Sequence, residues 1–291
     1  MGVSDPSAPP IVHRAGVVAL LGRPNAGKST LLNRVLGQKL AIVTAKPQTT
    51  RSRILGVLTL PHAQLLLLDT PGLHEASRAL NRALNAIATD VADDCDVALL
   101  LIDSRAPWDE AHAALRERLE KRGTPLLVVA TKSDLGGTPP PEAQLAISAS
   151  TGAGVDELVA RAAALLPESP PLYDPETVTD RTLRFLAAEE IREAIFEELE
   201  EELPYAIAVE IDQFDESRSD GVRIRATLWV ERDSQKGIVL GQGGRKIKAI
   251  GSRARLAIAA LLDGPAHLSL WVKVDPRWAK KPRRLAALGY W

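Results

Sequence analysis

Short apolar runs alternate with amphipathic stretches along the first half of the chain. The apolar runs are typical of buried strands: Val17–Leu21, Leu65–Leu68, Val97–Ile102, Pro125–Ala130 and the shorter Leu145–Ser148. The amphipathic stretches predict helices: Thr30–Leu36, Ala76–Ala92, Glu110–Arg122 and Val155–Leu166. This alternation predicts an α/β fold in which a mostly parallel sheet has helices on both faces. Arg53–Leu60 is less apolar, and we interpret it as an added edge strand, with an antiparallel direction as one option.

The pattern changes after residue 180. An apolar residue at every fourth position predicts one long helix, with Thr179 or Asp180 as its N-cap: Leu183, Ala187, Ile191, Ile195, Leu199 and Leu203. After this helix come two strands, a helical stretch with glycines and a last strand, at Ala206–Phe214, Val222–Val230, Lys236–Leu262 and Leu268–Val274. The order α-β-β-α-α-β predicts a small α+β domain, a three-stranded sheet with helices on one face.

Proline-rich residues separate the two patterns. Residues 167–171 read Pro-Glu-Ser-Pro-Pro, and successive prolines favour a stiff, extended backbone. A chain of 291 residues also suits two domains better than one. We therefore predict one domain at residues 12–168, a linker at 169–179 and a second domain at 180–291.

Composition excludes several classes of protein. Apolar residues make up 45% of the chain and charged residues 25%, which is typical of a globular protein and excludes wholesale disorder. Cys95 is the single cysteine, so an internal disulfide and a cysteine-built metal site are excluded. No apolar run approaches the roughly 18 residues of a membrane span, and Met1–Pro10 lacks a secretory pattern. We expect a cytoplasmic protein that acts as a monomer.

The net charge of −1 conceals a strong segregation of charge. Residues 181–235 hold 7 basic and 15 acidic side chains, a net charge of −8. Residues 236–291 hold 12 basic and 2 acidic side chains, a net charge of +10. Such a basic block within one domain indicates a surface that meets a polyanion, with a merely solvated charged surface as the alternative.

A complete phosphate-binding motif lies between the first predicted strand and the first predicted helix. Gly22–Ser29 reads Gly-Arg-Pro-Asn-Ala-Gly-Lys-Ser and matches GxxxxGK[ST]. Its glycines let backbone N–H groups converge on phosphates at the positive end of a helix. Lys28 would place its charge on the β- and γ-phosphates, and the Ser29 hydroxyl would coordinate Mg²⁺. The alternative, an ordinary strand–helix turn, explains four filled motif positions poorly.

Two later motifs distinguish GTP from ATP. Asp69-Thr70-Pro71-Gly72 ends a buried strand, so its carboxylate can hold the Mg²⁺ shell through water and Gly72 can bring an N–H close to the γ-phosphate. Thr131-Lys132-Ser133-Asp134 follows another buried strand, and the Asp134 carboxylate can accept the N1–H and N2 amine of guanine. Adenine has no proton on N1 and would leave this carboxylate unpaired. Ser148-Ala149-Ser150 would close the base pocket.

These motifs resemble those of the translation-factor-like GTPases. The resemblance implies that a switch-loop threonine, Thr50 or as second choice Thr49, completes the Mg²⁺ shell when GTP is bound. The usual guanine motif begins with Asn where this chain has Thr131, which leaves the side-chain contact at that position open. The predicted nucleotide-binding residues are Gly22, Arg23, Pro24, Asn25, Ala26, Gly27, Lys28, Ser29, Thr30, Asp69, Thr70, Pro71, Gly72, Thr131, Lys132, Asp134, Ser148 and Ala149.

The group that assists hydrolysis is less evident. Leu73 stands where many small GTPases carry a water-orienting Gln, so we expect slow intrinsic turnover, on the order of 10⁻⁴ to 10⁻² s⁻¹. In related GTPases without that Gln an Asn at the position of Asn25 binds K⁺; here the alternative is a loop-stabilising hydrogen bond. We interpret His74 as a surface residue and not a base. The predicted catalytic and switch residues are Lys28, Thr50, Gly72 and Asn25, and the predicted metal ligands are Ser29, Thr50 and Asp69.

A second glycine loop lies in the basic C-terminal block. Gly241-Gln242-Gly243-Gly244 forms a GxxG sequence between helical segments, and Arg245, Lys246 and Lys248 follow it. GxxG alone is a weak signal, but with the α-β-β-α-α-β order the segment resembles a type II KH domain. The resemblance implies that an RNA backbone approaches the loop while a neighbouring groove holds about four unpaired nucleotides. The basic side chains would attract phosphates without sequence preference.

The side chains around this loop have open roles. Those that would either contact bases or fill the core are Ile238, Val239 and Ile247. Those that would add to the positive surface are Arg253, Arg255 and the segment Lys280–Arg284. Trp229 and Trp271 lie on the strand face opposite the regular apolar set, where exposure is an option, and we expect them to pack against the terminal segment and not to stack on bases.

A GTPase domain joined by a short proline-containing linker to a KH domain is the arrangement of the Era-like GTPase family of bacterial ribosome assembly. The chain resembles this family over nearly its whole length, including Lys46–Arg51, Thr179–Arg181, Glu202–Tyr205 and Leu288–Tyr290. The resemblance implies binding to the 3′ end of 16S ribosomal RNA on the maturing small (30S) subunit. It also implies some peripheral association with the inner face of the cell membrane.

Two other functions are consistent with parts of the sequence. One is an RNA-binding scaffold whose nucleotide is structural and is not turned over. The other is a tRNA-modifying GTPase, a family that shares the Asn25-type loop. The second is disfavoured because that family has a C-terminal cysteine motif, whereas Cys95 lies within the first predicted domain.

Overall fold

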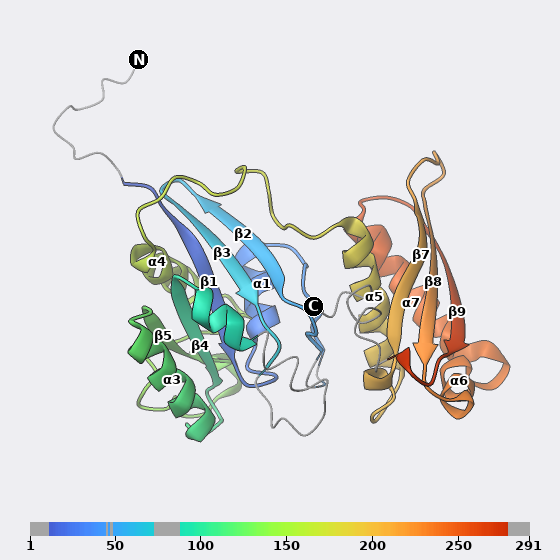
Figure 1. Cartoon of the computed structure of the whole chain (residues 1–291), viewed down its shortest axis with the longest axis horizontal. Coiled ribbons are helices and arrows are strands. Elements are labelled where there is room, and N and C mark those ends of the chain that lie inside the picture. Colours follow the sequence, from blue (N-terminus) through green and yellow to red (C-terminus); the bar gives the residue numbers. More distant parts are fainter. Residues whose placement is uncertain (1–11, 45, 47–48, 73–87, 279–291) are drawn as a thin grey trace, which may run out of the picture.

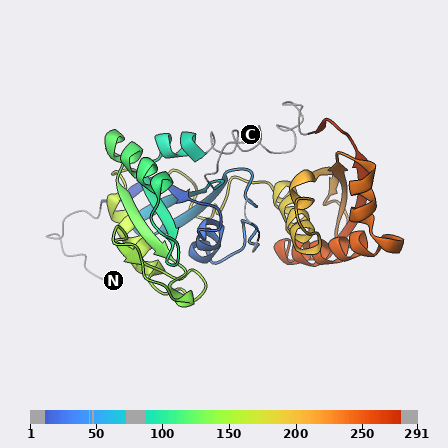
Figure 2. The same cartoon turned by 90° about the horizontal axis from the view of Figure 1, so that it is seen from below.

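The computed structural model describes residues 12–44, 46, 49–72 and 88–278. An N-terminal α/β unit and a smaller C-terminal unit lie side by side, with helix α5 (Leu183–Glu198) of the second unit turned toward the first (Figure 1). Figure 2 shows the same arrangement from below. Within these residue ranges, none of the helices combines the length and apolar character that a bilayer crossing requires.

The N-terminal unit is built on a six-stranded sheet in the order β2-β3-β1-β4-β5-β6. Its strands are β1 (Arg14–Gly22), β2 (Ile54–Leu60), β3 (Ala63–Asp69), β4 (Val97–Asp103), β5 (Leu126–Thr131) and β6 (Leu145–Ala146). Neighbouring strands pair in parallel except for β2, which runs antiparallel to β3 at the edge. The predicted mostly parallel sheet is therefore confirmed. The added edge strand is antiparallel, one of the two directions left open by the sequence.

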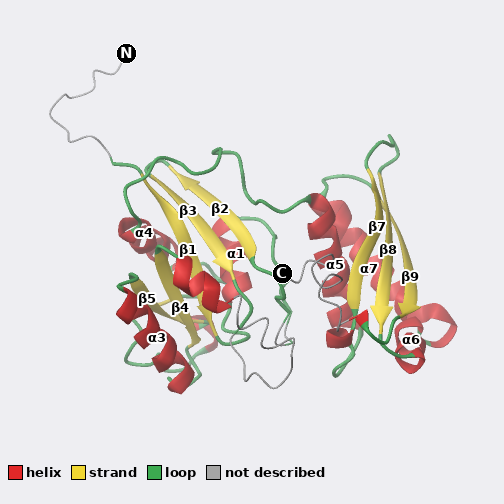
Figure 3. Ribbon diagram, in the orientation of Figure 1, coloured by secondary structure: helices red, strands yellow, loops and turns green. Residues whose placement is uncertain are grey.

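Helices cover both faces of this sheet (Figure 3). On one face α1 (Lys28–Leu36) and α4 (Val155–Leu165) pack on the core that includes Leu99, and on the other α3 (Glu110–Arg122) packs on the core that includes Leu100. Successive strand residues point to opposite faces, so burial on both sides requires an unbroken apolar run. Of the predicted helix Ala76–Ala92, residues 88–92 are helical and the rest lies outside the described residues.

The C-terminal unit has the predicted α-β-β-α-α-β order. After α5 come β7 (Ala208–Asp215), β8 (Val222–Val230), α6 (Asp233–Leu240), α7 (Arg245–Leu261) and β9 (Ala266–Val274). The strands form a three-stranded sheet in the order β7-β8-β9, antiparallel between β7 and β8 and parallel between β8 and β9. Buried residues of α5, the sheet and α7, such as Ile191, Leu228 and Ile258, form its core.

The ends of α5 differ from the prediction. Its N-cap is Thr182, whose side chain accepts a hydrogen bond from Phe185 N at 3.2 Å, because the Thr179 hydroxyl donates instead to Leu55 O at 2.6 Å. The helix stops at Glu198, so Leu199 is a buried C-cap in extended conformation and Leu203 lies beyond it. Lys46 Nζ donates to Phe196 O and Leu199 O and thus satisfies carbonyls that a helix end leaves unpaired.

The proline-rich segment between the units is hydrogen-bonded to the edge of the first sheet. Gln64, which is fully buried, accepts hydrogen bonds from the N–H groups of Leu172 and Tyr173 and donates to Tyr173 O. Val57 N donates to Val178 O at 2.8 Å. The segment therefore follows the edge strand β2, while the boundaries at residues 168 and 179 stay predictions.

Candidate nucleotide-binding site and nucleic-acid interface

The loop Gly22–Ser29 joins β1 to α1 and encloses one charged side chain. Lys28 is 6% exposed, and its ammonium donates to Gly22 O at 3.1 Å and to Arg23 O at 2.9 Å. Burial lowers the pKa of Lys28 to about 8, against the opposing effect of the Asp69 carboxylate. The loop is also tied to the start of α3, because Arg23 pairs with Asp109 at 2.5 Å. The predicted point charge thus lies inside the loop.

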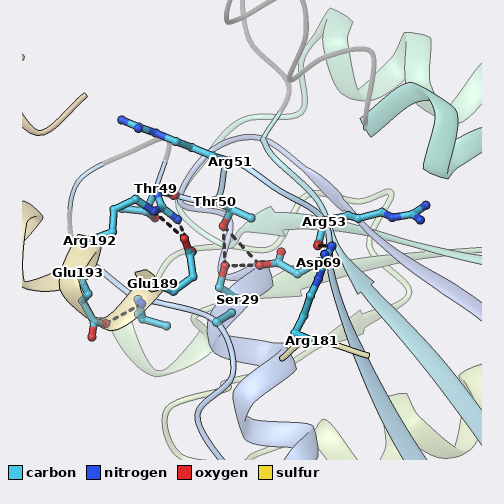
Figure 4. Close-up of polar contacts among 12 residues, drawn as sticks. Ser29, Thr49, Thr50, Arg51, Arg53, Asp69, Arg181, Glu189, Arg192 and Glu193 are labelled. Carbon is cyan, nitrogen blue, oxygen red and sulfur yellow. Dashed lines mark hydrogen bonds and ion pairs between the residues drawn. The ribbon is translucent and has the colours of Figure 1, made fainter. Parts of the chain in front are cut away.

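Three oxygen-bearing side chains converge beside Lys28 from three separate parts of the chain (Figure 4). Ser29 Oγ lies 2.6 Å from Asp69 Oδ2 and 3.0 Å from Thr50 Oγ1, and Thr50 Oγ1 lies 3.4 Å from Asp69 Oδ2. Burial raises the pKa of Asp69, which Lys28 and the two hydroxyls partly oppose. Asp69 is fully buried, and its Oδ1 atom has no hydrogen-bond partner among the described residues.

This oxygen cluster fits Mg²⁺. Hydroxyl and carboxylate oxygens are the donors that this hard cation prefers, and it keeps several of its own waters. The unpartnered Asp69 Oδ1 can accept from such a water. Of the two candidate threonines, Thr50 brings its hydroxyl to the cluster, whereas the Thr49 carbonyl accepts a hydrogen bond from Arg192 of α5.

The turn after β3 lies directly against the phosphate-binding loop. A Cβ atom on Gly72 would lie 2.5 Å from Pro24 N and 2.7 Å from Pro24 Cα, so only glycine fits there. Thr70 donates to Leu20 O at 2.8 Å and anchors the turn to β1. Leu73 and His74 lie outside the described residues.

A cavity of about 550 Å³ opens over these groups. The predicted residues that line it are Pro24, Asn25, Gly27, Lys28, Ser29, Thr30, Thr50, Gly72 and Lys132. It is also lined by residues of the switch loop and by one arginine, Ile42, Val43, Thr44, Thr49 and Arg105. The predicted base-pocket residues Asp134, Ser148 and Ala149 do not line it; Asp134 is exposed, on the short helix 133–135 that follows β5.

Thr131 has a contact that the sequence left open. Its hydroxyl lies 2.8 Å from Ala26 O and 3.1 Å from Ile102 O, and its one hydrogen can serve either carbonyl. The residue is buried, so the hydroxyl fastens β5 to the phosphate-binding loop. An Asn side chain is therefore not needed at this position to join the two motifs.

An ion-pair cluster beside the cavity escaped the sequence analysis. Asp103, at the end of β4, pairs with Arg105 at 2.8 Å and with Lys132 Nζ at 3.0 Å. The Arg105 guanidinium, with smaller help from Lys132, holds the pKa of the Asp103 carboxyl well below its usual range. The sequence could have indicated Asp103 as a candidate site residue, because it ends a buried strand as Asp69 does.

The second glycine loop is open where the first is closed. Gly241–Gly244 connects α6 to α7, and a Cβ on Gly243 or Gly244 would meet nothing within 4 Å. Arg245 donates to Gln242 Oε1 at 2.6 Å, which holds the loop against the first turn of α7. Lys246 is exposed and Lys248 lines an adjoining groove, so the positive charge lies at the surface.

That groove, of about 310 Å³, runs between α7 and β9. Its walls are Ile247, Lys248, Gly251, Ser252, Arg255, Leu268 and Leu270. Ile247, Lys248 and Arg255 are among the predicted residues, whereas Leu268 and Leu270 were not predicted, although the alternation along β9 places them on one face.

The other candidate side chains have different places. Val239 is a core residue, whereas Ile238 is 51% exposed. Arg253 does not face the groove side, because it pairs with Glu197 at 3.0 Å and Glu198 at 3.2 Å on α5. Trp271 is 45% exposed, and its packing against the terminal segment stays a prediction because residues 279–291 lie outside the described residues. Lys280–Arg284 and Leu288–Tyr290 lie outside the described residues.

The fold and the first site define a P-loop GTPase domain, followed by a KH domain. Residues 17–132 match the family described as 50S ribosome-binding GTPase, and residues 202–279 match the KH domain family. The chain is 42% identical to GTPase Era of Stenotrophomonas maltophilia, over 96% of this chain and 98% of that protein. It is 41% identical to GTPase Era of Geobacter metallireducens, over 95% and 98%.

Solved structures show the same likeness. A crystal structure of Era in complex with MgGDPNP and nucleotides 1506–1542 of 16S ribosomal RNA is 36% identical, with a TM-score of 0.89 over 96% of this chain and 99% of that one. A variant of Aquifex aeolicus Era bound to GDP.AlF4− is 35% identical, with a TM-score of 0.88 over 95% and 99%. The chain belongs to the Era family of GTPases.

Proposed function

We propose that this protein is a GTP-hydrolysing switch that binds the 3′ end of 16S rRNA and acts in assembly of the 30S subunit. The observation that carries the proposal is the convergence of Ser29, Thr50 and Asp69 beside the buried Lys28. The related Era structure in complex with MgGDPNP and 16S rRNA nucleotides supports the choice of both ligands.

Each group of the first site has a role in phosphoryl transfer. Lys28 neutralises charge on the β- and γ-phosphates, and Ser29, Thr50 and, through water, Asp69 hold Mg²⁺. The Gly72 N–H, brought against the loop by the absence of a side chain, reaches the γ-phosphate. Thr50 and Gly72 both depend on that phosphate, so hydrolysis removes the ligand that holds them in place.

The base is selected by Asp134, which accepts two hydrogen bonds from guanine. Ser148 and Ala149 close the pocket around the base. K⁺ at Asn25 would supply the positive charge that an arginine finger supplies elsewhere; Asn25 lies in the cavity wall with a left-handed backbone, φ 59°. Equal turnover in K⁺ and Na⁺ would exclude this role.

RNA binding is assigned to the KH domain. The open loop Gly241–Gly244 admits a phosphate backbone, and Arg245, Lys246 and Lys248 attract it. The groove between α7 and β9 is apolar on one side and basic on the other, as unpaired nucleotides require. We place the protein in the cytoplasm, with peripheral membrane contact as a further, separate prediction.

Substitution of Asp134 tests the nucleotide assignment. Asp134→Asn should shift preference from GTP toward xanthosine triphosphate by at least about tenfold, because xanthine presents an acceptor where guanine has its N2 amine. Competition binding of the two triphosphates measures the shift. Asp233→Asn, the same change on α6 of the KH domain, is the control and should leave the preference unchanged.

Phosphate release separates the switch from a scaffold with a structural nucleotide. Multiple turnovers, measured with and without an oligoribonucleotide of the 16S 3′ end, support the proposal.

In the Asp134→Asn experiment, a preference for GTP that does not change would contradict the base-pocket assignment.

A further inference from the structure

Two arginines, Arg192 and Arg51, join the loop that carries Thr50 to the C-terminal unit, and Figure 4 shows the contact of Arg192 with Thr49. Arg192 of α5 donates to Thr49 O, and both Arg192 and its partner Glu189 belong to the KH domain. Arg51 donates to three carbonyls at the start of the KH sheet: to Pro204 O at 3.2 Å, to Tyr205 O at 2.9 Å and to Ile207 O at 3.0 Å.

Both guanidinium groups are buried between the domains. Arg51 is 3% exposed and Arg192 is 4% exposed. A buried charge is tolerated when its donors are satisfied, and these contacts supply acceptors to both groups. Separation of the C-terminal unit from the loop would remove the Pro204, Tyr205 and Ile207 carbonyls from Arg51 and the Thr49 carbonyl from Arg192. These contacts therefore resist small displacements of the loop.

Three consecutive residues contact the KH domain, the metal-binding cluster and again the KH domain. The Thr49 carbonyl faces Arg192, the Thr50 hydroxyl lies 3.0 Å from Ser29 Oγ, and the Arg51 side chain returns to the KH domain. Adjacent Cα atoms are fixed about 3.8 Å apart. Thr50 therefore cannot leave the metal-binding cluster by more than a few ångströms without disturbing the contacts on either side.

The rest of the loop repeats the arrangement. Lys39 pairs with Glu190 at 2.7 Å and also with Glu193, and Val43 N donates to Glu193 Oε1 at 3.0 Å. Lys46 donates to the last carbonyls of α5. Lys39, Val43 and Lys46, between α1 and β2, thus contact this one helix or its C-terminal end.

We propose that Arg192 is a positioning residue for the GTPase reaction: it acts through Thr49 to hold Thr50 at the Mg²⁺ site, and so makes GTP binding and docking of α5 mutually dependent. The inference rests on the proposed role of Thr50. Because coupling between two sites is reciprocal, docking of α5 must favour GTP by the same factor by which GTP favours docking. GDP lacks the γ-phosphate and gains less from the contact.

Nucleotide binding to four full-length variants tests the inference. Arg192→Ala should weaken a non-hydrolysable GTP analogue about tenfold and GDP less than about twofold, the size expected for one charge-assisted hydrogen bond. The Mg²⁺ concentration for half-maximal hydrolysis should rise. Arg192→Lys keeps a donor without the planar fork and should recover part of the loss. Arg253→Ala, which removes pairs within the KH domain only, is the control. It should change neither the affinity for the GTP analogue relative to GDP nor the Mg²⁺ concentration for half-maximal hydrolysis.

A double variant tests whether the effect of Arg192→Ala arises only because Glu189 is left without its partner. Glu189→Ala with Arg192→Ala leaves no uncompensated charge, so it should fold and show the same preferential loss of the GTP analogue. An unchanged ratio of analogue affinity to GDP affinity in both variants overturns the inference, whether both affinities stay as in the wild type or both fall equally; an equal fall marks a merely structural role. Failure of the wild-type protein to bind guanine nucleotides would instead overturn the proposed function.

Discussion

The two glycine loops of this protein each lead into a helix and each suit phosphate, but they enclose charge differently. The loop Gly22–Ser29 wraps around one buried ammonium, that of Lys28, whose pKa burial lowers to about 8. The loop Gly241–Gly244 is open, with Lys246 exposed beside it. A closed loop fixes the position of one phosphate chain of defined length, whereas an open loop accepts any phosphate in a continuous backbone.

The difference follows from how much of the fold meets at each loop. Around the first loop, β3, β5 and α3 all supply side chains or backbone, through Gly72, Thr131 and Asp109. The second loop is held chiefly by its own neighbour, Arg245. Selectivity in this chain therefore increases with the number of separate elements that converge on a loop.

The largest expected effect is at the closed loop. Lys28→Ala removes the buried ammonium that the loop encloses and should weaken GTP and GDP roughly a hundredfold or more, since a charged contact in a desolvated site contributes about 3 kcal/mol. Isothermal titration calorimetry measures both affinities. RNA affinity in the absence of nucleotide should stay within about twofold, and an equal loss of RNA binding would contradict the separation of the two loops.

A smaller effect is expected at the open loop. Gly243→Asp places a carboxylate against the RNA backbone and should lower RNA affinity about tenfold, with GTP affinity unchanged. Gly123→Asp is a matched control, because Gly123 has φ +71° against +62° at Gly243 and a Cβ there also meets nothing within 4 Å. Fluorescence anisotropy with a labelled oligoribonucleotide compares the two. Equal losses for both variants would contradict the assignment.

The two loops should also differ in their response to salt. Lys248→Ala should reduce the slope of log affinity against log salt for RNA by about 0.7, the value for one phosphate of a single strand. The same substitution should leave the salt response of GTP binding unchanged. Titrations between about 50 and 200 mM salt measure the slope. A flat salt response in the wild-type protein would contradict a basic RNA surface.

The smallest effect concerns the ion pairs beside the closed loop. Asp103 has an ordinary pKa of 3.8, which Arg105 and Lys132 lower in the folded state. Its ionised form therefore stabilises the fold above that pH, and the contribution is lost as the pH falls below it. Asp103→Asn should cost about 1 kcal/mol of unfolding free energy at neutral pH. Denaturant unfolding should show this difference shrinking below about pH 4, whereas a constant difference would contradict the linkage.

The sequence was sufficient for the elements whose periodicity decides them. Strands β1, β3, β4 and β5 contain continuous apolar runs because both faces are buried, and a motif begins at the end of β1, β3 and β5. The apolar residue at every fourth position predicted α5 but placed its end too late: the helix stops at Glu198, where Lys46 donates to carbonyls at the helix end. Local pattern could not show this contact between residues about 150 positions apart.

The same reasoning explains what was found and missed in the sites. The residues Lys28, Ser29 and Asp69 belong to motifs of fixed spacing, so their meeting could be predicted. Arg51 and Arg192 act through backbone carbonyls, which every residue carries, and no side-chain pattern marks them. Which residues of β9 line the groove depends on the face of the sheet that α7 covers, and that is decided by tertiary packing and not by the local sequence pattern.

The path of the proline-rich segment restricts how the KH domain can move. Gln64 and Val57 clip this segment to the first sheet, Thr179 holds Leu55 O, and Arg181 donates to Arg53 O at 2.5 Å. The RNA-binding domain is therefore not attached through a loose linker. Arg181 directly precedes Thr182, the N-cap of α5, so no free linker residue lies between the last contact with the first sheet and the first turn of that helix.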